Sequence, residues 1–257
     1  MLLFKRLFSF KQGALGWLLD KRKATRYPIG AGFPLKATVN LTGSTAPASV
    51  GRGCDWAGQL ADFSSVGARL QLPPAAVAVR GEPTVLRLTL EGHAMQVPCK
   101  VAHFRTYHSH SFCGLTLQFE DKAGQKAYLQ LFETVVTGSS FAPCTPTGYV
   151  RNPPGLIREQ YKSHNGARLS AWRDAKSRKL ASFEFVMGDH GVKGRAGVPV
   201  LEIYTRQKTD KPLKVTLSAP ELSLLPGAHE EIRRFFKWMV PNLAKVVPAD
   251  LRALMSR

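Results

Sequence analysis

Two short segments of the chain carry side chains that could grip a nucleotide. Arg22-Lys-Ala-Thr-Arg26 places two guanidinium groups four residues apart, and Asp62-Phe-Ser64-Ser-Val-Gly67 follows later in the chain. An arginine fork matches adjacent acceptors such as O6 and N7 of guanine, and the same donors bind phosphate oxygens. The Asp62 carboxylate can accept from the amino and imino groups of guanine, Ser64 can bridge to base or phosphate, and Gly67 lets the backbone approach closely. Together the two segments predict a clamp for a guanine nucleotide.

Both segments also have a purely structural interpretation. An arginine pair is common in a solvated basic leader that has no specific partner. Asp62 and Ser64 can instead bond backbone amides within a turn, which is compatible with a further role in binding. The order of the two segments, around a series of short strands, favours the nucleotide interpretation.

Composition indicates a globular protein with an anionic partner. The 257 residues fit two small domains better than one large one, and 44% hydrophobic with 21% charged residues suffices for a core. Lys and Arg number 36 against 18 Asp and Glu, a formal charge of +18. The excess is +6 over residues 1–35, +2 over residues 36–145 and +10 over residues 146–257. The near-neutral middle therefore indicates a compact core, and the two basic ends indicate separate places for anions.

The middle of the chain alternates apolar and polar residues with a period of two. This pattern predicts half-buried strands at residues 35–41, 68–72, 86–90, 97–101 and 115–119. Five or six short strands separated by turn-rich segments fit an antiparallel barrel better than a sheet with crossover helices. A helix is expected over residues 122–136, with Ala127, Leu131, Phe132 and Val135 on one side.

The C-terminal half predicts an α+β domain of unknown type. Residues 138–155 concentrate Gly, Ser and Pro, which predicts a linker. Strands are expected at residues 182–187, 200–205 and 213–217. A helix should follow with Ile232, Phe235, Phe236 and Met239 inward, ending at Pro241, and a last helix should begin near Pro248.

The two motifs in this order resemble the PilZ domain, the bacterial receptor module for cyclic di-GMP. The likeness covers roughly residues 20–137, including the strand FCGLTLQF and the helix after it, but not the C-terminal half. The resemblance implies a mainly β N-terminal half, a six-stranded antiparallel barrel with a closing helix. It also implies a set of cyclic di-GMP contacts: Arg22, Arg26, Asp62, Ser64, Gly67 and, beside them, Lys21 and Arg69. Lys21, before the first arginine, would influence whether one ligand or a stacked pair is bound.

These inferences predict a receptor and not an enzyme. The sequence holds no nucleophile elbow, no HExxH and no EAL-like or GGDEF-like signature, so no catalytic residue, metal or cofactor is expected beyond the ligand. We expect an amphipathic segment at 1–20, the barrel at 21–137 and an output or interaction domain at 156–257 that relays binding to a protein partner. The alternatives are a basic nucleic-acid-binding protein that uses the barrel as a scaffold, and a barrel that serves only as an interaction module.

The N-terminal segment carries an apolar stripe at helical spacing. Leu3, Leu7, Phe10, Ala14 and Trp17 share this stripe, which fits a helix docked on the protein slightly better than one lying on a membrane surface. Basic residues interrupt the segment, so no export signal is expected. We therefore expect a cytoplasmic protein with free thiols, with peripheral contact to the inner membrane through residues 1–20 as an option.

Two further clusters have simpler explanations than a site. Cysteine and histidine residues between Cys99 and Cys113 could suggest zinc, but their spacing matches no compact zinc module, and YHSHS fits the tip of a hairpin. The glycines of Gly188–Gly197 match neither a dinucleotide fingerprint nor a Walker motif, so a hairpin turn is expected there.

Overall fold

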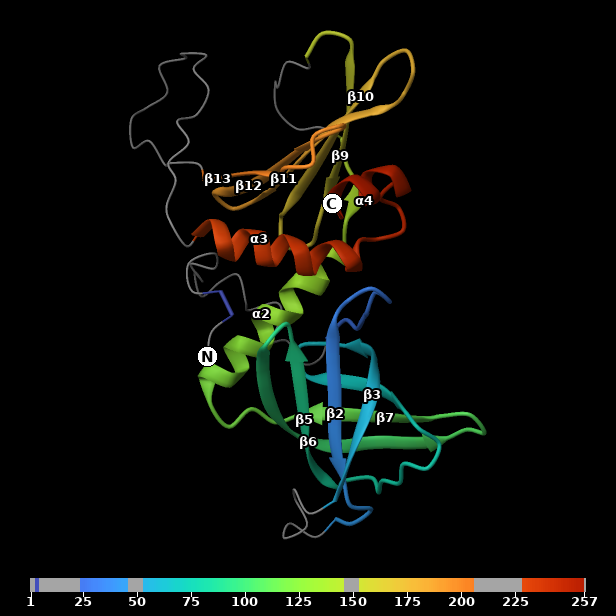
Figure 1. Ribbon diagram of the computed structural model, residues 1–257. Coiled ribbons are helices and arrows are strands. Elements are labelled where there is room, and N and C mark those ends of the chain that lie inside the picture. The colour runs from blue at the N-terminus through green and yellow to red at the C-terminus, as the bar shows by residue number, and fades with distance from the viewer. Residues whose placement is uncertain (1–2, 5–23, 46–52, 146–152, 206–227, 257) are drawn as a thin grey trace. The chain divides into compact units, whose positions relative to one another are not determined.

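The computed structural model describes residues 3–4, 24–45, 53–145, 153–205 and 228–256 (Figure 1). These residues form two compact units, one with Leu3 and residues 24–133 and the other with Phe4 and the described residues from Thr134 onward. The expected N-terminal stripe, apart from Leu3, and the expected strand at residues 213–217 lie outside the described residues.

The first unit is a closed antiparallel barrel. Neighbouring strands run in the order β3-β2-β5-β6-β7-β4, and β4 pairs again with β3, which closes the sheet. A short strand β1 adds to the free edge of β3. The bounds are β1 (Tyr27–Pro28), β2 (Leu35–Leu41), β3 (Cys54–Phe63), β4 (Gly67–Leu72), β5 (Pro83–Leu90), β6 (His93–Thr106) and β7 (Ser111–Leu117). The expected six-stranded antiparallel barrel is confirmed.

Alternation along these strands fills the barrel interior with apolar side chains. Val39, Leu70, Leu86 and Leu115 are fully buried there, as the period of two predicts. The helix α2 (Lys122–Ser139) follows the barrel and covers one end of it (Figure 1). The Phe63 ring at the end of β3 meets the α2 side chains Tyr128 and Phe132 edge to face, with ring centroids 5.9 and 5.0 Å apart. This aromatic contact fixes the end of β3 against the helix.

In the part of the chain that the structure describes, the second unit is a six-stranded antiparallel meander with helices against it. Its order is β13-β12-β11-β10-β9-β8. The bounds are β8 (Ala142–Pro143), β9 (Leu156–Lys162), β10 (Arg168–Asp174), β11 (Leu180–Met187), β12 (His190–Arg195) and β13 (Glu202–Thr205), then α3 (Ala228–Met239), the 3-10 turn η3 (Val240–Asn242) and α4 (Ala249–Met255). The Phe183 and Phe236 rings stack at 5.9 Å between β11 and α3. This arrangement confirms the α+β class.

The second unit differs from the sequence expectations in three places. Strands β9 and β10 form where no strand was expected. Most of Gly188–Gly197, expected to be only a turn, forms strand β12 over His190–Arg195. The last turn of α2 and the strand β8 lie inside the segment expected to be a linker, residues 138–155, and the proposed domain bounds stay a prediction.

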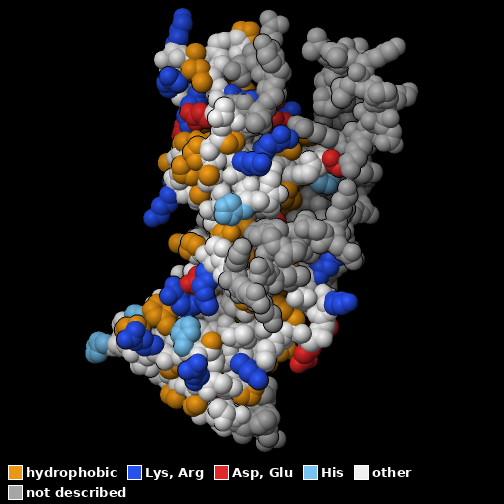
Figure 2. Space-filling view, turned by 180° about the vertical axis from the view of Figure 1, so that it is seen from behind, with side chains coloured by type: hydrophobic (Ala, Val, Ile, Leu, Met, Phe, Trp, Pro, Cys, Tyr) orange, Lys and Arg blue, Asp and Glu red, His pale blue; other side chains and the backbone are white. Residues whose placement is uncertain are grey.

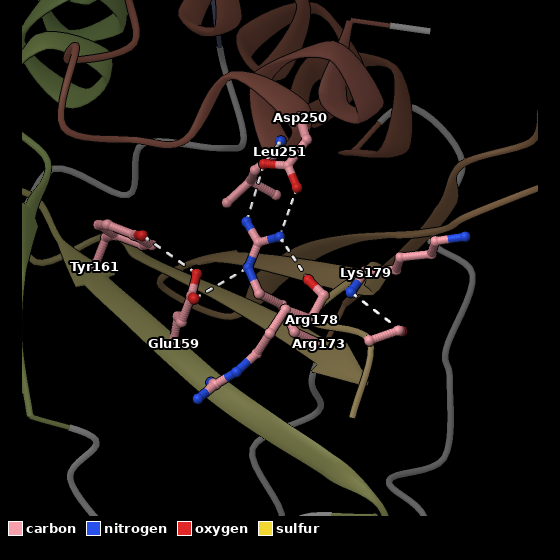
Figure 3. Close-up of polar contacts among 8 residues, drawn as sticks. Glu159, Tyr161, Arg173, Arg178, Lys179, Asp250 and Leu251 are labelled. Carbon is pink, nitrogen blue, oxygen red and sulfur yellow. Dashed lines mark hydrogen bonds and ion pairs between the residues drawn. The ribbon is translucent and has the colours of Figure 1, made fainter. Parts of the chain in front are cut away.

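A buried arginine ties β10 to the last helix. Arg173 is 9% exposed and donates from both terminal nitrogens to Asp250, at 2.5 and 2.9 Å, and from Nε to Glu159 at 3.0 Å (Figure 3). Its Nη1 also donates to the carbonyl oxygen of Arg178 in the β10–β11 turn. A buried charge requires such partners, and this arginine therefore belongs to the framework of the unit.

Candidate functional site

Asp62 lies on the outer face of the barrel because β3 contains a bulge. Leu60 points inward and pairs with Leu70, and the register then shifts so that Asp62, and not Ala61, lies opposite Arg69. Phe63 then points inward again, opposite Ala68. A bulge inserts one extra residue into a strand and re-aims the side chains beyond it. The carboxylate is therefore presented outside a strand whose neighbours fill the core.

Cations flank this carboxylate on two sides. β1 pairs with β3 at Pro28 and Asp62, which brings Arg26 to one side, while β4 brings Arg69 to the other. Nη1 of Arg26 lies 2.8 Å from Oδ1 of Asp62, and Nη2 of Arg69 lies 2.6 Å from Oδ2. The structure thus brings together three of the residues that the sequence assigned to the site.

The side chains of this trio, Arg26, Asp62 and Arg69, differ in their exposure to solvent. The Asp62 side chain is 11% exposed, whereas Arg26 and Arg69 are 46% and 44% exposed. Each guanidinium carries five N–H donors, and its ion pair uses only part of them. The trio therefore offers solvent a net positive, donor-rich surface with a carboxylate acceptor behind it, which suits a ligand that has both anionic and donor groups.

Hydrogen bonds within the turn after Asp62 stabilise its conformation. The Ser64 amide donates to the carbonyl oxygen of Gly67 at 2.7 Å, and the Ser64 hydroxyl accepts from the Val66 amide at 3.4 Å. Ser64 is only 2% exposed, so the turn interpretation of this serine is present in the structure. At Gly67, a Cβ would lie 2.9 Å from the carbonyl oxygen of Leu115 and 3.5 Å from Nη2 of Arg26. Glycine is thus the residue that lets β4 start close to β7 and to the arginine.

A residue that the sequence analysis did not name supports the same turn. Tyr128 of α2 is fully buried and donates from its hydroxyl to the carbonyl oxygen of Ser64 at 2.8 Å. Burial raises the pKa of Tyr128 well above its ordinary value, so the phenol stays a donor. No sequence signal separates this tyrosine from the apolar stripe of the helix.

The remaining predicted contacts are placed differently. Lys21 and Arg22 lie outside the described residues. Among the described residues no group of three His, Cys, Asp or Glu side chains is arranged to hold a metal ion. All four cysteines are free thiols, and burial raises the pKa of Cys99 and of Cys113 to about 12. The segment YHSHS forms the tip of the β6–β7 hairpin, as expected.

Comparison with known proteins shows which family the first unit is similar to. Residues 20–133 match the family model of the PilZ domain, which confirms the resemblance seen in the two motifs. Among curated proteins none matches the chain. Among solved structures, the PilZ domain of CeSA from a cellulose synthesizing bacterium is 16% identical, over 42% of this chain and 94% of that chain, with a TM-score of 0.31. Within the described residues no helix is both long and apolar enough to cross a membrane.

Proposed function

We propose that the chain, which carries a PilZ domain over residues 20–133, is a receptor for cyclic di-GMP. The observation that carries this proposal is Asp62 held on the outer face of the barrel between Arg26 and Arg69. PilZ is a fold known to bind this second messenger, so the family match and the local chemistry point to the same ligand.

The ligand has two guanines and two phosphates, and each kind of group has a matching partner in the site. The Asp62 carboxylate accepts from the N1 imino and N2 amino groups of one guanine. Arg26 and Arg69, each nearly half exposed, donate to phosphate oxygens and to O6 and N7. Following the family resemblance, Lys21 and Arg22 add positive charge from the segment that precedes β1, and Ser64 and Gly67 shape the turn under the base. These roles make the chain a binding protein and not a catalyst.

Binding at this site offers a way to transmit a signal. β1, which brings Arg26 to Asp62, is a strand of two residues at the edge of β3. A ligand that bridges Arg26 and Asp62 adds contacts between this end of β1 and the barrel, and thereby orders the Arg26 side chain. We propose that this ordering is relayed to a protein partner through the C-terminal unit, in the cytoplasm, with residues 1–20 docked on the protein or at the inner membrane.

Isothermal titration of the full chain with cyclic di-GMP tests the receptor proposal. We expect Arg26→Ala and Asp62→Ala each to weaken binding by about 1.5–3 kcal/mol, the contribution of a hydrogen bond to a charged group. Arg87→Ala is a matched control, because it removes one arginine charge and one exposed ion pair, with Asp55, elsewhere on the barrel. Its affinity should equal that of the wild type. GTP, GMP and cyclic di-AMP should bind more weakly than cyclic di-GMP.

The opposite result favours the nucleic-acid alternative. The folded wild type could fail to bind cyclic di-GMP and instead bind single-stranded RNA with a steep dependence on salt and little dependence on sequence. The positive charge would then bind nucleic acid, and the receptor proposal would be wrong.

A further inference from the structure

A second bulge lies in β6, and the strands β4 and β7 separate it from the bulge in β3. In β6 the register shifts between Val101 and His103, so that Val101 points inward opposite Leu115 and His103 lies opposite Gly114. Gly114 of β7 is itself paired with Arg69 of β4. Without the shift, the side chain of His103 would point into the barrel, as that of Val101 does. This bulge thus re-aims His103 as the bulge in β3 re-aims Asp62.

The two bulges place four residues of four adjacent strands in one row on the outer face. The row runs from Asp62 on β3 through Arg69 on β4 and Gly114 on β7 to His103 on β6. Strands lie about 4.8 Å apart, so a side chain above Gly114 is about 10 Å from the strand that carries Asp62. A chemical group at this end of the row is within reach of one ligand bound at Asp62.

The imidazole of His103 fills the space that glycine leaves. A Cβ at Gly114 would lie 1.9 Å from Cε1 of His103 and 2.4 Å from each ring nitrogen, so the ring lies directly over the Gly114 backbone. His103 is nevertheless exposed. Its ring is therefore supported from beneath by the strand and presents its outer side to solvent.

Further flat groups continue this surface. The Arg69 guanidinium carbon lies 5.3 Å from the Phe112 ring centroid, and His110 meets Phe112 edge to face at 4.9 Å. A hollow of about 400 Å³, lined in part by Gln59, Gln71 and His110, extends along the same face. Figure 2 shows basic, hydrophobic and His side chains gathered on this part of the barrel. We call Arg69, His103 and Phe112 the outer-face strip.

We propose that the outer-face strip seats the second guanine of cyclic di-GMP, an inference that rests on the proposed receptor function. Aromatic rings interleaved with guanidinium groups are a surface on which nucleobases stack. Asp62 has acceptors for one guanine only, so the other base of the same ligand needs a place, and the strip is the flat surface next to it in the row. His103 and Arg69 can in addition donate to O6 and N7 at the edge of that base.

Substitutions at His103 and beneath it test this inference by titration with cyclic di-GMP. His103→Ala should weaken binding about 5- to 150-fold, the scale measured when a stacking side chain is truncated. Gly114→Ala should give a similar loss, because the added methyl displaces the ring. The double variant should lose no more than either single variant, since both act on one contact. His108→Ala, at the exposed hairpin tip, is the matched control and should bind like the wild type.

A direct readout on the wild type does not depend on these variants. Stacking of a guanine should shift the Hε1 resonance of His103 upfield during titration, with assignment from a His103→Gln sample. His103→Phe, which keeps a flat ring, should retain more affinity than His103→Gln.

The outcomes separate this inference from the receptor proposal. If the wild type binds and Arg26→Ala loses binding, while His103→Ala and Gly114→Ala bind normally and the His103 resonance stays in place, the strip is not the seat and the receptor proposal stands. If the folded wild type does not bind cyclic di-GMP at all, both fail together.

Discussion

Gly67→Ala tests whether the close approach of β4 to β7 shapes the site. The Gly67 backbone is not left-handed, so an alanine can adopt its conformation, and only the new methyl group matters. That methyl would lie 2.9 Å from the carbonyl oxygen of Leu115 and 3.5 Å from Nη2 of Arg26. The first atom is backbone within the sheet and yields little, whereas the second is the end of a flexible side chain. The strain therefore falls mainly on the β4–β7 pairing, and part of it pushes on the arginine.

The size of the effect follows from these contacts. Overpacking against a fixed group costs about 1–3 kcal/mol, and the lower entropy of alanine in the unfolded chain returns about 0.4–1 kcal/mol. We expect a net loss of about 1–2 kcal/mol in the free energy of unfolding. In a domain of about 100 residues each kcal/mol lowers the melting temperature by about 4–8 °C. Affinity for cyclic di-GMP should fall less than in Arg26→Ala, because the guanidinium is displaced and not removed.

Thermal unfolding followed by circular dichroism, together with titration calorimetry, measures both effects. In the double variant Gly67→Ala/Arg26→Ala, the affinity should equal that of Arg26→Ala alone, while the loss of stability should persist. An unchanged melting temperature in Gly67→Ala would refute the claim that the Leu115 carbonyl leaves no room for a side chain at this position.

Three further predictions concern the framework around the site and the second unit. Tyr128→Phe removes the buried hydrogen bond to the carbonyl oxygen of Ser64 and should cost about 1–2 kcal/mol in urea unfolding; equal stability would mean that this bond does not hold the turn. Arg173→Met should destabilise the second unit by about 1–2 kcal/mol near pH 7. Arg173 lowers the pKa of Asp250 in the folded state, so the stabilisation by this ion pair is present above the ordinary carboxyl pKa. It is lost as the pH falls through the pKa that Asp250 has in the folded protein. A stability difference between wild type and Arg173→Met that grows in acid would contradict the pairing. Thiol labelling at about pH 8 should leave Cys99 and Cys113 unmodified until the protein unfolds, because their thiolates form only as the pH nears 12. Rapid labelling of either cysteine in the folded protein would contradict this.

The barrel was predictable where one face of each strand is buried. From Leu86 to Leu90, β5 alternates between leucines inside and polar residues outside, which the period of two reveals. β3 escaped the pattern, because its first half, from Cys54 to Gly58, is exposed or half-buried on both faces. The alternation of apolar and polar residues arises from burial of one face and not from the backbone conformation. The part of a strand that extends beyond the core therefore lacks this alternation.

The second unit was harder to predict because charged residues lie on its buried face. β9 and β10 contribute Glu159 and Arg173 to the ion-paired cluster with Asp250, and these charges interrupt the apolar alternation of both strands. The partners of a buried arginine come together only in the folded structure. A sequence pattern cannot distinguish such a strand from a polar loop.

The candidate site shows the same division between local and tertiary information. The types and spacing of the motif residues predict Arg26 and Asp62, the family resemblance adds Arg69, and the structure brings the three together. The sequence suggests only a zinc-ligand role for His103, because nothing in the sequence shows that its ring lies over Gly114.

Both bulges solve one geometric problem of a site built outside a filled barrel. A strand that lines the core has room outside only at every second residue, so side chains two apart share a face. Leu60 and Asp62 break this rule, as do Val101 and His103, and in each case the register shift lies between the two residues. The bulges keep Leu60, Phe63 and Val101 in the core while turning the carboxylate and the imidazole to the same outer row as Arg69. The proposed ligand site is therefore positioned by two local departures from regular pairing, and the regular strands β4 and β7 between them keep the row in place.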